Sequence, residues 1–351
     1  MRRRVRFGLA AALALSMVAA ACGSDDDGGG SADTTGGSEE TSGGSEETTG
    51  GSAAPAPAGD GDEVVRLAVN PWTGSAVNAH VAKAVIETAG LGSVELVEID
   101  ENAMWPAISK GDTLDGVLEI WPSGHAADYE TYITGNQGII DGGLLGPDAK
   151  IGWYVPQFVI DEHPELATWE GFKDPELAGL FKTAESGDQG QFLMGDPSYV
   201  SYDEQIIENL ELPLKFVTAG SEAALITAIQ NSIADQKPLL LQFWQPHWLQ
   251  SQVELAEVEL PEFTDECAAS AEANDGKYAC DYPVDKLYKA FSDKLEGKAP
   301  NSFAVLSNLQ LTTEQQNEIA ALIDGEGLEP AAAAQQWVDA NEDVWKAWLP
   351  A

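Results

Sequence analysis

Apolar runs and amphipathic stretches alternate along the chain from residue 64 onward. Three short runs predict strands: VVRLAV (64–69), SVELVEI (93–99) and GVLEIWP (116–122). Two stretches with helical spacing lie between them, each closed by a glycine: SAVNAHVAKAVIETAG (75–90) and NAMWPAISKG (102–111). This alternation predicts an α/β fold, with a mostly parallel sheet flanked by helices.

A second series of the same kind follows. Further strands are predicted at 150–156, 191–195, 214–220, 238–244 and 254–260. Residues 168–181 predict an irregular helical region, and further helices are predicted at 202–212, 221–237, 284–296, 312–323 and 329–348. Ser221 is the expected N-cap of its helix, and Pro238 follows that helix. The near-continuous apolar run PLLLQFW (238–244) is typical of a buried parallel strand.

The length of this region favours two lobes over one core. Residues 64–351 exceed the usual size of a single core. We expect a first lobe begun by 64–150, a second lobe formed by 151–258, and a return to the first lobe by 259–351. In such sheets a ligand binds beyond the carboxyl ends of the strands.

The N-terminus has the features of an export and anchoring segment. Residues 1–21 combine four arginines with a short apolar run and small residues, which predicts a signal peptide. The following Cys22 resembles the cysteine of a bacterial lipobox, with Ala19 where Leu is usual, and would carry the lipid anchor. Residues 22–63 are rich in Gly, Ser and acids and predict a disordered linker. We therefore expect an exported protein, anchored by lipid to the outer face of the cell membrane.

The charge of the chain restricts its partners. There are 58 Asp and Glu against 18 Lys and Arg, a net charge of −40. Binding to nucleic acid or to an anionic membrane surface is disfavoured, because both need clustered basic residues. Arg66 is the sole arginine after residue 6, so few anion clamps are available. The balance favours a neutral or cationic small ligand.

Two cysteines remain besides Cys22. Cys267 and Cys280 lie in an acidic, loop-like stretch of an exported chain, which favours a disulfide over a metal site. No histidine lies near them with ligand spacing, so no metal is expected. No GxSxG, HExxH, P-loop or GxGxxG motif is present, so no cofactor is expected and an enzyme is disfavoured. An exported enzyme and an envelope structural protein stay as alternatives.

Three of the ten tryptophans lie at predicted strand ends next to turns: Trp72, Trp121 and Trp244. Each one alone is explained by packing. Together, from strands of both lobes, they suggest an aromatic cage, which binds a quaternary ammonium by cation–π attraction. Trp337, Trp345 and Trp348 share a predicted helix face and are expected in the core.

Several ordered motifs resemble the glycine betaine/choline-type substrate-binding proteins of ABC importers. They are NPWTGSAVNAHVAKAVIE, NAMWPAISKGDTLDGVLEIWPSGH, GDPSYV, FWQPHW and AAAAQQWVDANEDVWKAWLP. The resemblance covers essentially all of 64–351. It implies a two-lobe periplasmic-binding-protein fold of type II, with the ligand in the cleft between the lobes.

The resemblance also implies roles for particular residues. Cage positions fall on Trp72, Trp121, Trp244 and Tyr199. The ligand carboxylate would be bound by His125 and by the backbone amides of Ser198 and Tyr199, without an arginine.

The implied ligand is a quaternary ammonium compatible solute used in osmoprotection. Glycine betaine is the first candidate, and choline, carnitine, proline betaine and proline are alternatives. The implied partners are permease subunits of an ABC transporter, and we expect a monomer.

Overall fold

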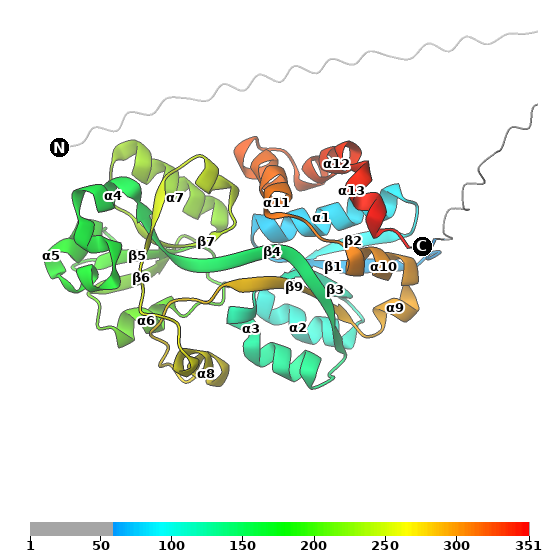
Figure 1. The fold of residues 1–351 in the computed structure, drawn as a ribbon, viewed down its shortest axis with the longest axis horizontal. Coiled ribbons are helices and arrows are strands. Elements are labelled where there is room, and N and C mark those ends of the chain that lie inside the picture. The colour runs from blue at the N-terminus through cyan, green and yellow to red at the C-terminus, as the bar shows by residue number, and fades with distance from the viewer. Residues whose placement is uncertain (1–58, 351) are drawn as a thin grey trace, which may run out of the picture. The chain divides into compact units, whose positions relative to one another are not determined.

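The computed structural model describes residues 59–350 (Figure 1). The predictions for 1–21, for Cys22 and for most of the linker 22–63 therefore lie outside the described residues. Among residues 59–350, no helix is both long and apolar enough to cross a membrane.

A mixed sheet connects the whole described region. Its strand order is β2-β1-β3-β9-β4-β7-β5-β6, and β8 pairs with β4. The strands are β1 (Val64–Val69), β2 (Ser93–Glu98), β3 (Gly116–Ile120), β4 (Ile139–Pro156), β5 (Gly190–Met194), β6 (Leu214–Thr218), β7 (Leu240–Gln245), β8 (Leu255–Val258) and β9 (Asp285–Ser292). Strands β1, β2 and β3 are parallel to one another, and so are β5, β6 and β7.

Two lobes form around these two parallel sets. Strand β4 is long enough to serve both: its first part pairs antiparallel with β9, and its second part with β7 and β8. In Figure 1, β4 and β9 are seen crossing between the two lobes. The α/β architecture predicted from the sequence is confirmed.

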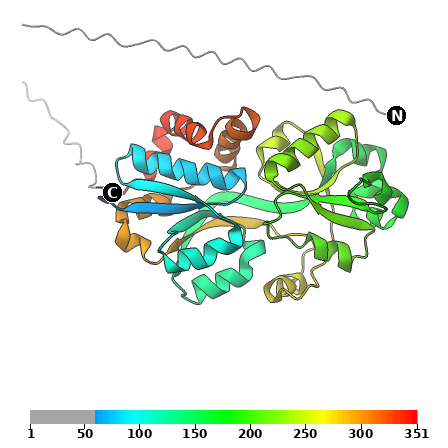
Figure 2. The same cartoon turned by 180° about the vertical axis from the view of Figure 1, so that it is seen from behind.

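Helices cover both faces of each sheet half. They are α1 (Thr73–Thr88), α2 (Glu101–Lys110), α3 (Pro122–Asp128), α4 (Gln157–Glu162), α5 (Pro175–Ala178), α6 (Asp203–Asn209), α7 (Glu222–Asp235), α8 (Asp265–Ala273), α9 (Leu295–Lys298), α10 (Pro300–Asn308), α11 (Thr313–Ala320), α12 (Pro330–Ala340) and α13 (Glu342–Trp345). In the first lobe, α1, α11 and α12 lie on one face of the sheet, and α2 and α3 lie on the other (Figures 1 and 2).

Local signals explain several helix ends. Asp100 caps α2 by accepting the amides of Asn102 and Ala103, and Gly111 ends that helix in the left-handed conformation. Ser221 caps α7 as predicted, accepting the amide of Ala224. The tryptophans expected in the core, Trp337, Trp345 and Trp348, are buried.

The predicted helix at 284–296 is wrong, because residues Asp285–Ser292 form strand β9. This strand lies between β3 and β4 and is buried on both faces. A strand buried on both faces loses its polar alternation, so its apolar positions can mimic helical spacing. Even Lys289 is buried, and its ammonium donates to the carbonyls of Leu306, Ser307 and Leu309.

The segment after β8 belongs to the packing of the second lobe. Tyr278 and Tyr282 are buried in the same cluster as Trp153 and Phe192 of that lobe. Cys267 and Cys280 form a disulfide, which ties α8 to this segment. The chain therefore returns to the first lobe at β9, later than the expected residue 259.

Candidate functional site

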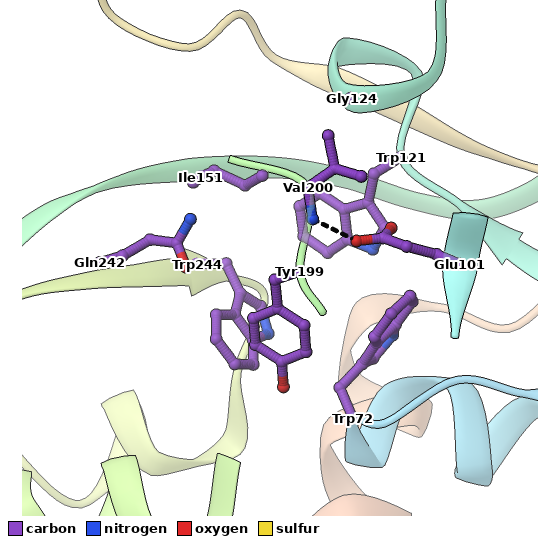
Figure 3. Close-up of a pocket in the computed structure, with 9 residues that line it drawn as sticks. All are labelled: Trp72, Glu101, Trp121, Gly124, Ile151, Tyr199, Val200, Gln242 and Trp244. Carbon is purple, nitrogen blue, oxygen red and sulfur yellow. Dashed lines mark hydrogen bonds between the residues drawn. The ribbon is translucent and has the colours of Figure 1, made fainter. Parts of the chain in front are cut away.

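Residues at or just after the ends of four parallel strands line one pocket. Trp72 follows β1, Trp121 follows β3, Tyr199 follows β5, and Trp244 lies at the end of β7. The pocket and its mouth together hold about 470 Å³ of empty space, part of which is open to solvent. Its lining residues, shown in Figure 3, are Trp72, Glu101, Trp121, Gly124, Ile151, Tyr199, Val200, Gln242 and Trp244.

The aromatic rings form several walls of this pocket. The ring of Tyr199 lies 5.9 Å from that of Trp72 and 5.9 Å from that of Trp244, and it is nearly perpendicular to both. The hydroxyl of Tyr199 donates to the carbonyl of Pro71, which fixes the ring. In Figure 3, Trp121 lies above the space between these three rings. All four predicted cage residues therefore lie around one cavity.

A buried glutamate holds two of the rings from behind. Oε1 of Glu119 accepts the indole N–H of Trp72 at 2.7 Å and that of Trp121 at 3.0 Å. Its Oε2 accepts the side-chain amides of Asn78 and Gln316. Burial raises the pKa of Glu119 to about 7, against the opposing effect of the indole hydrogen bonds. Both indole N–H groups are thereby directed away from the cavity.

A second glutamate, Glu101, faces the pocket from the start of α2. Its Oε1 accepts the backbone amide of Val200, from the other lobe. Its Oε2 lies 2.8 Å from Nε2 of His125. Among the described lining residues, Glu101 is the one charged side chain, and neither Lys nor Arg contributes.

His125, predicted to contact a ligand carboxylate, does not line the pocket. It is 1% exposed, with Nε2 against Glu101 and Nδ1 3.0 Å from Asp128. The indole nitrogen of Trp105 lies 3.2 Å from the same Nδ1. Although burial opposes the charged form, hydrogen bonds to Asp128 and Glu101 raise the pKa of His125 to about 9. Its imidazolium therefore pairs with Glu101 and does not contact the cavity.

The backbone amides predicted to bind a carboxylate are engaged within the chain. The Ser198 amide donates to Oδ1 of Asp196, and the Tyr199 amide donates to the carbonyl of Asp196. The Ser198 hydroxyl also donates to Oδ1 of Asp196. Ser198 lines the outer groove beyond Trp72 and not the aromatic pocket.

Contacts between the lobes surround the pocket. Glu222, in the first turn of α7, accepts the amide of Thr73 at 2.6 Å and its hydroxyl at 3.0 Å. Thr73 is the first residue of α1, so a carboxylate of one lobe caps a helix of the other. The indole of Trp248 donates to Asp324, also across the lobes. These contacts depend on the two lobes lying together.

Sequence reasoning missed Glu101, Glu119 and Glu222. Glu119 had a signal, because an acid inside the apolar run GVLEI needs buried partners. Glu101 and Glu222 look like ordinary acids in the first turn of a helix, so their position in the sequence does not mark them as site residues.

No group of three or more potential metal ligands occurs within residues 59–350. Arg66 pairs with Glu95 on the sheet surface and is not a lining residue.

Comparison with known proteins agrees with this architecture. The chain is 25% identical over 295 residues to the trimethylamine N-oxide-binding protein of Pelagibacter ubique, covering 82% of this chain and 91% of that one. A glycine betaine/L-proline-binding protein (ProX) structure from Borrelia burgdorferi superposes with a TM-score of 0.67 at 17% identity, over 82% and 97% of the two chains. Lactococcal OpuAC, in its closed form with glycine betaine, superposes with a TM-score of 0.64 at 18% identity, over 82% and 100%.

These superpositions show the type II periplasmic-binding-protein fold predicted from the sequence. Residues 63–340 match the sequence model of the OpuAC family, the substrate-binding domain of ABC-type glycine betaine transport systems. Proteins of this family bind small ammonium compounds and work with ABC transporter permeases; they are not enzymes. The chain belongs to this family and is an extracytoplasmic substrate-binding protein of a betaine/choline-type ABC transporter.

Proposed function

We propose that this protein captures a small solute with a permethylated ammonium group by surrounding that group with Trp72, Trp121, Tyr199 and Trp244. The supporting observation is that four aromatic rings from both lobes line one cavity. A quaternary ammonium cannot donate hydrogen bonds, so it is recognised by ring faces, each worth about 2 kcal/mol or more when desolvated.

Closure of the lobes buries the bound group and presents it to the permease. Residues of both lobes supply the rings, so the complete cage exists when the lobes lie together. Interlobe contacts such as Thr73 with Glu222 stabilise this arrangement. Hinge closure of two domains around a ligand is a common mechanism of such proteins.

All candidate solutes except proline carry a methylated nitrogen. Glycine betaine is the first candidate from the sequence, with choline, carnitine, proline betaine and proline as alternatives. The trimethylamine N-oxide relative adds a further trimethylated compound to this set. Proline carries two N–H groups and lacks N-methyl groups, so it fits an aromatic cage least.

The test is a binding screen by tryptophan fluorescence and calorimetry against these six compounds, with ectoine as a further comparison. We expect saturable binding of at least one trimethylated compound and weaker binding of proline. Saturable binding of none of the methylated compounds, in protein that is folded by circular dichroism, would contradict the proposal.

We also propose that Cys22 carries the lipid that anchors the chain outside the cell membrane, and that the protein acts as a monomer. Metabolic labelling with a fatty acid tests the anchor: labelling should be lost in Cys22→Ala, and the protein should then be released into the soluble fraction. Retention of both label and membrane association would contradict it. Light scattering of the purified chain tests the oligomeric state.

A further inference from the structure

The polar end of the aromatic pocket, at Glu101, presents a hydrogen-bond acceptor to a ligand. Glu101 lines the pocket and is 7% exposed. Its two oxygens accept from the Val200 amide and from His125. A carboxylate oxygen has two lone pairs, so each oxygen can accept a further hydrogen bond. A ligand group that donates a hydrogen bond therefore has a partner here.

Donors for a ligand carboxylate are scarce. The indoles of Trp72 and Trp121 donate to Glu119, and the Ser198 and Tyr199 amides donate to Asp196. The Val200 amide donates to Glu101 itself. The side-chain amide of Gln242, a further lining residue, is hydrogen-bonded to the buried carboxyl group of Asp203. Of the ring N–H groups of the described lining residues, that of Trp244 has no partner. A buried carboxylate needs several donors, so one indole does not satisfy it.

The charges near Glu101 leave a net negative site. His125, whose pKa is raised to about 9, lies between Glu101 and Asp128, so one positive group balances two carboxylates. A ligand carboxylate placed at this end would face the largely buried carboxylate of Glu101 at short range. Like charges placed together in such a site oppose binding strongly.

We infer that Glu101 is a specificity-determining residue, which selects a trimethylammonium cation bearing a hydroxyl group, as in choline, over betaines bearing a carboxylate. This inference rests on the proposed function, because the cage must first hold the methylated nitrogen. It differs from the expectation that glycine betaine is the ligand. The histidine and the amides predicted to bind the betaine carboxylate are hydrogen-bonded to acidic residues of the chain itself.

Calorimetry with four probes tests the inference at pH 7.5: tetramethylammonium, choline, glycine betaine and trimethylamine N-oxide. We expect choline to bind at least tenfold more tightly than glycine betaine. Trimethylamine N-oxide presents an acceptor oxygen and should also bind more weakly than choline. Tetramethylammonium, which carries the head group alone, reports on the cage without the polar end.

The variant Glu101→Gln removes the charge and retains an amide oxygen to accept from Val200. We expect it to reduce the choline-to-glycine-betaine affinity ratio at least tenfold. Glu95→Gln is the matched control, because that side chain is 60% exposed on the edge strand β2 and should leave the ratio unchanged.

The outcomes separate the inference from the proposed function. Glycine betaine or trimethylamine N-oxide binding as tightly as choline to the wild type, or a ratio unchanged in Glu101→Gln, would overturn the inference. Because the wild-type comparison needs no variant, it decides the matter even if Glu101→Gln does not fold. Binding of none of the four probes, tetramethylammonium included, would instead overturn the aromatic cage itself.

Discussion

Trp72 and Trp121 donate their indole N–H groups to the same oxygen of one buried carboxylate, Oε1 of Glu119, at 2.7 and 3.0 Å. The two rings come from turns 49 positions apart in the sequence, yet a single acceptor sets the direction of both. The structure thus couples the aim of two pocket walls to one side chain that does not line the pocket.

Removing that acceptor should loosen both rings. Glu119→Ala leaves two buried indole N–H groups without a partner, and we expect ligand affinity to fall more than tenfold. Glu119→Gln is the matched control, because its amide oxygen can accept both indoles; we expect it to lose less than fivefold. Calorimetry with the tightest-binding methylated solute provides the measurement. Equal losses in the two variants would contradict a positioning role.

Truncation of the rings themselves should have a larger effect. Trp72→Ala and Trp244→Ala each remove a wall that also contacts Tyr199, and we expect affinity to fall about 30-fold or more for each. Trp169→Ala is the control, because Trp169 lies in the second lobe outside the pocket, with Lys173 over its ring. Unchanged calorimetric affinity in both pocket variants would refute the cage.

The stability of the fold should depend on pH through Glu119. Its pKa rises from 4.5 to about 7 on folding, so the folded chain retains a proton that the unfolded chain releases. The stability associated with this proton is fully present below pH 4.5 and is lost as the pH rises through 7. We therefore expect the unfolding free energy of the wild type, relative to Glu119→Gln, to fall by about 3 kcal/mol between pH 4.5 and pH 8.5. Urea titrations at several pH values measure this difference, and a flat difference would contradict it.

Binding of a cation should release protons near neutral pH. A cation held against Trp72 and Trp121 favours the ionised form of Glu119, so the pKa of Glu119 falls on binding. We expect the release of a fraction of a proton at pH 7, seen as a binding enthalpy that varies with the ionisation enthalpy of the buffer. The variation should disappear in Glu119→Gln. Proton uptake by the wild type would have the wrong sign for this mechanism.

The contact of Glu222 with Thr73 should control closure. Glu222→Ala removes the carboxylate that accepts two hydrogen bonds from Thr73 across the lobes and also lies 3.1 Å from His247. We expect about tenfold weaker binding, expressed as faster dissociation, and a larger radius of gyration by solution X-ray scattering. Glu314→Ala, an exposed acid in the first turn of α11, is the control. A slower or unchanged dissociation rate would argue against this role.

Strand β9 shows where the local pattern misleads. Its residues Leu287, Tyr288 and Phe291 have helical spacing, but the chain places them in a strand with neighbours on both sides. That outcome depends on β3 and β4, which are distant in the sequence. By contrast, β1 and α7 carry their own signals, an apolar run and a capping serine, and their predictions were confirmed.

The sequence by itself determined the alternation of strands and helices, the family resemblance and the strand-end aromatic residues. Those features depend on local periodicity and on short motifs, which can be read along the chain. The tertiary structure decided which polar groups remain available in the pocket. His125 has the right chemistry for a carboxylate, but Glu101, 24 residues away in the sequence, comes close enough in space to occupy it. The Ser198 amide is occupied by a local contact instead, because Asp196 lies only two residues before it. Hydrogen-bond partners are chosen by distance in the folded chain, and Glu101 joins its partner Val200 across 99 residues.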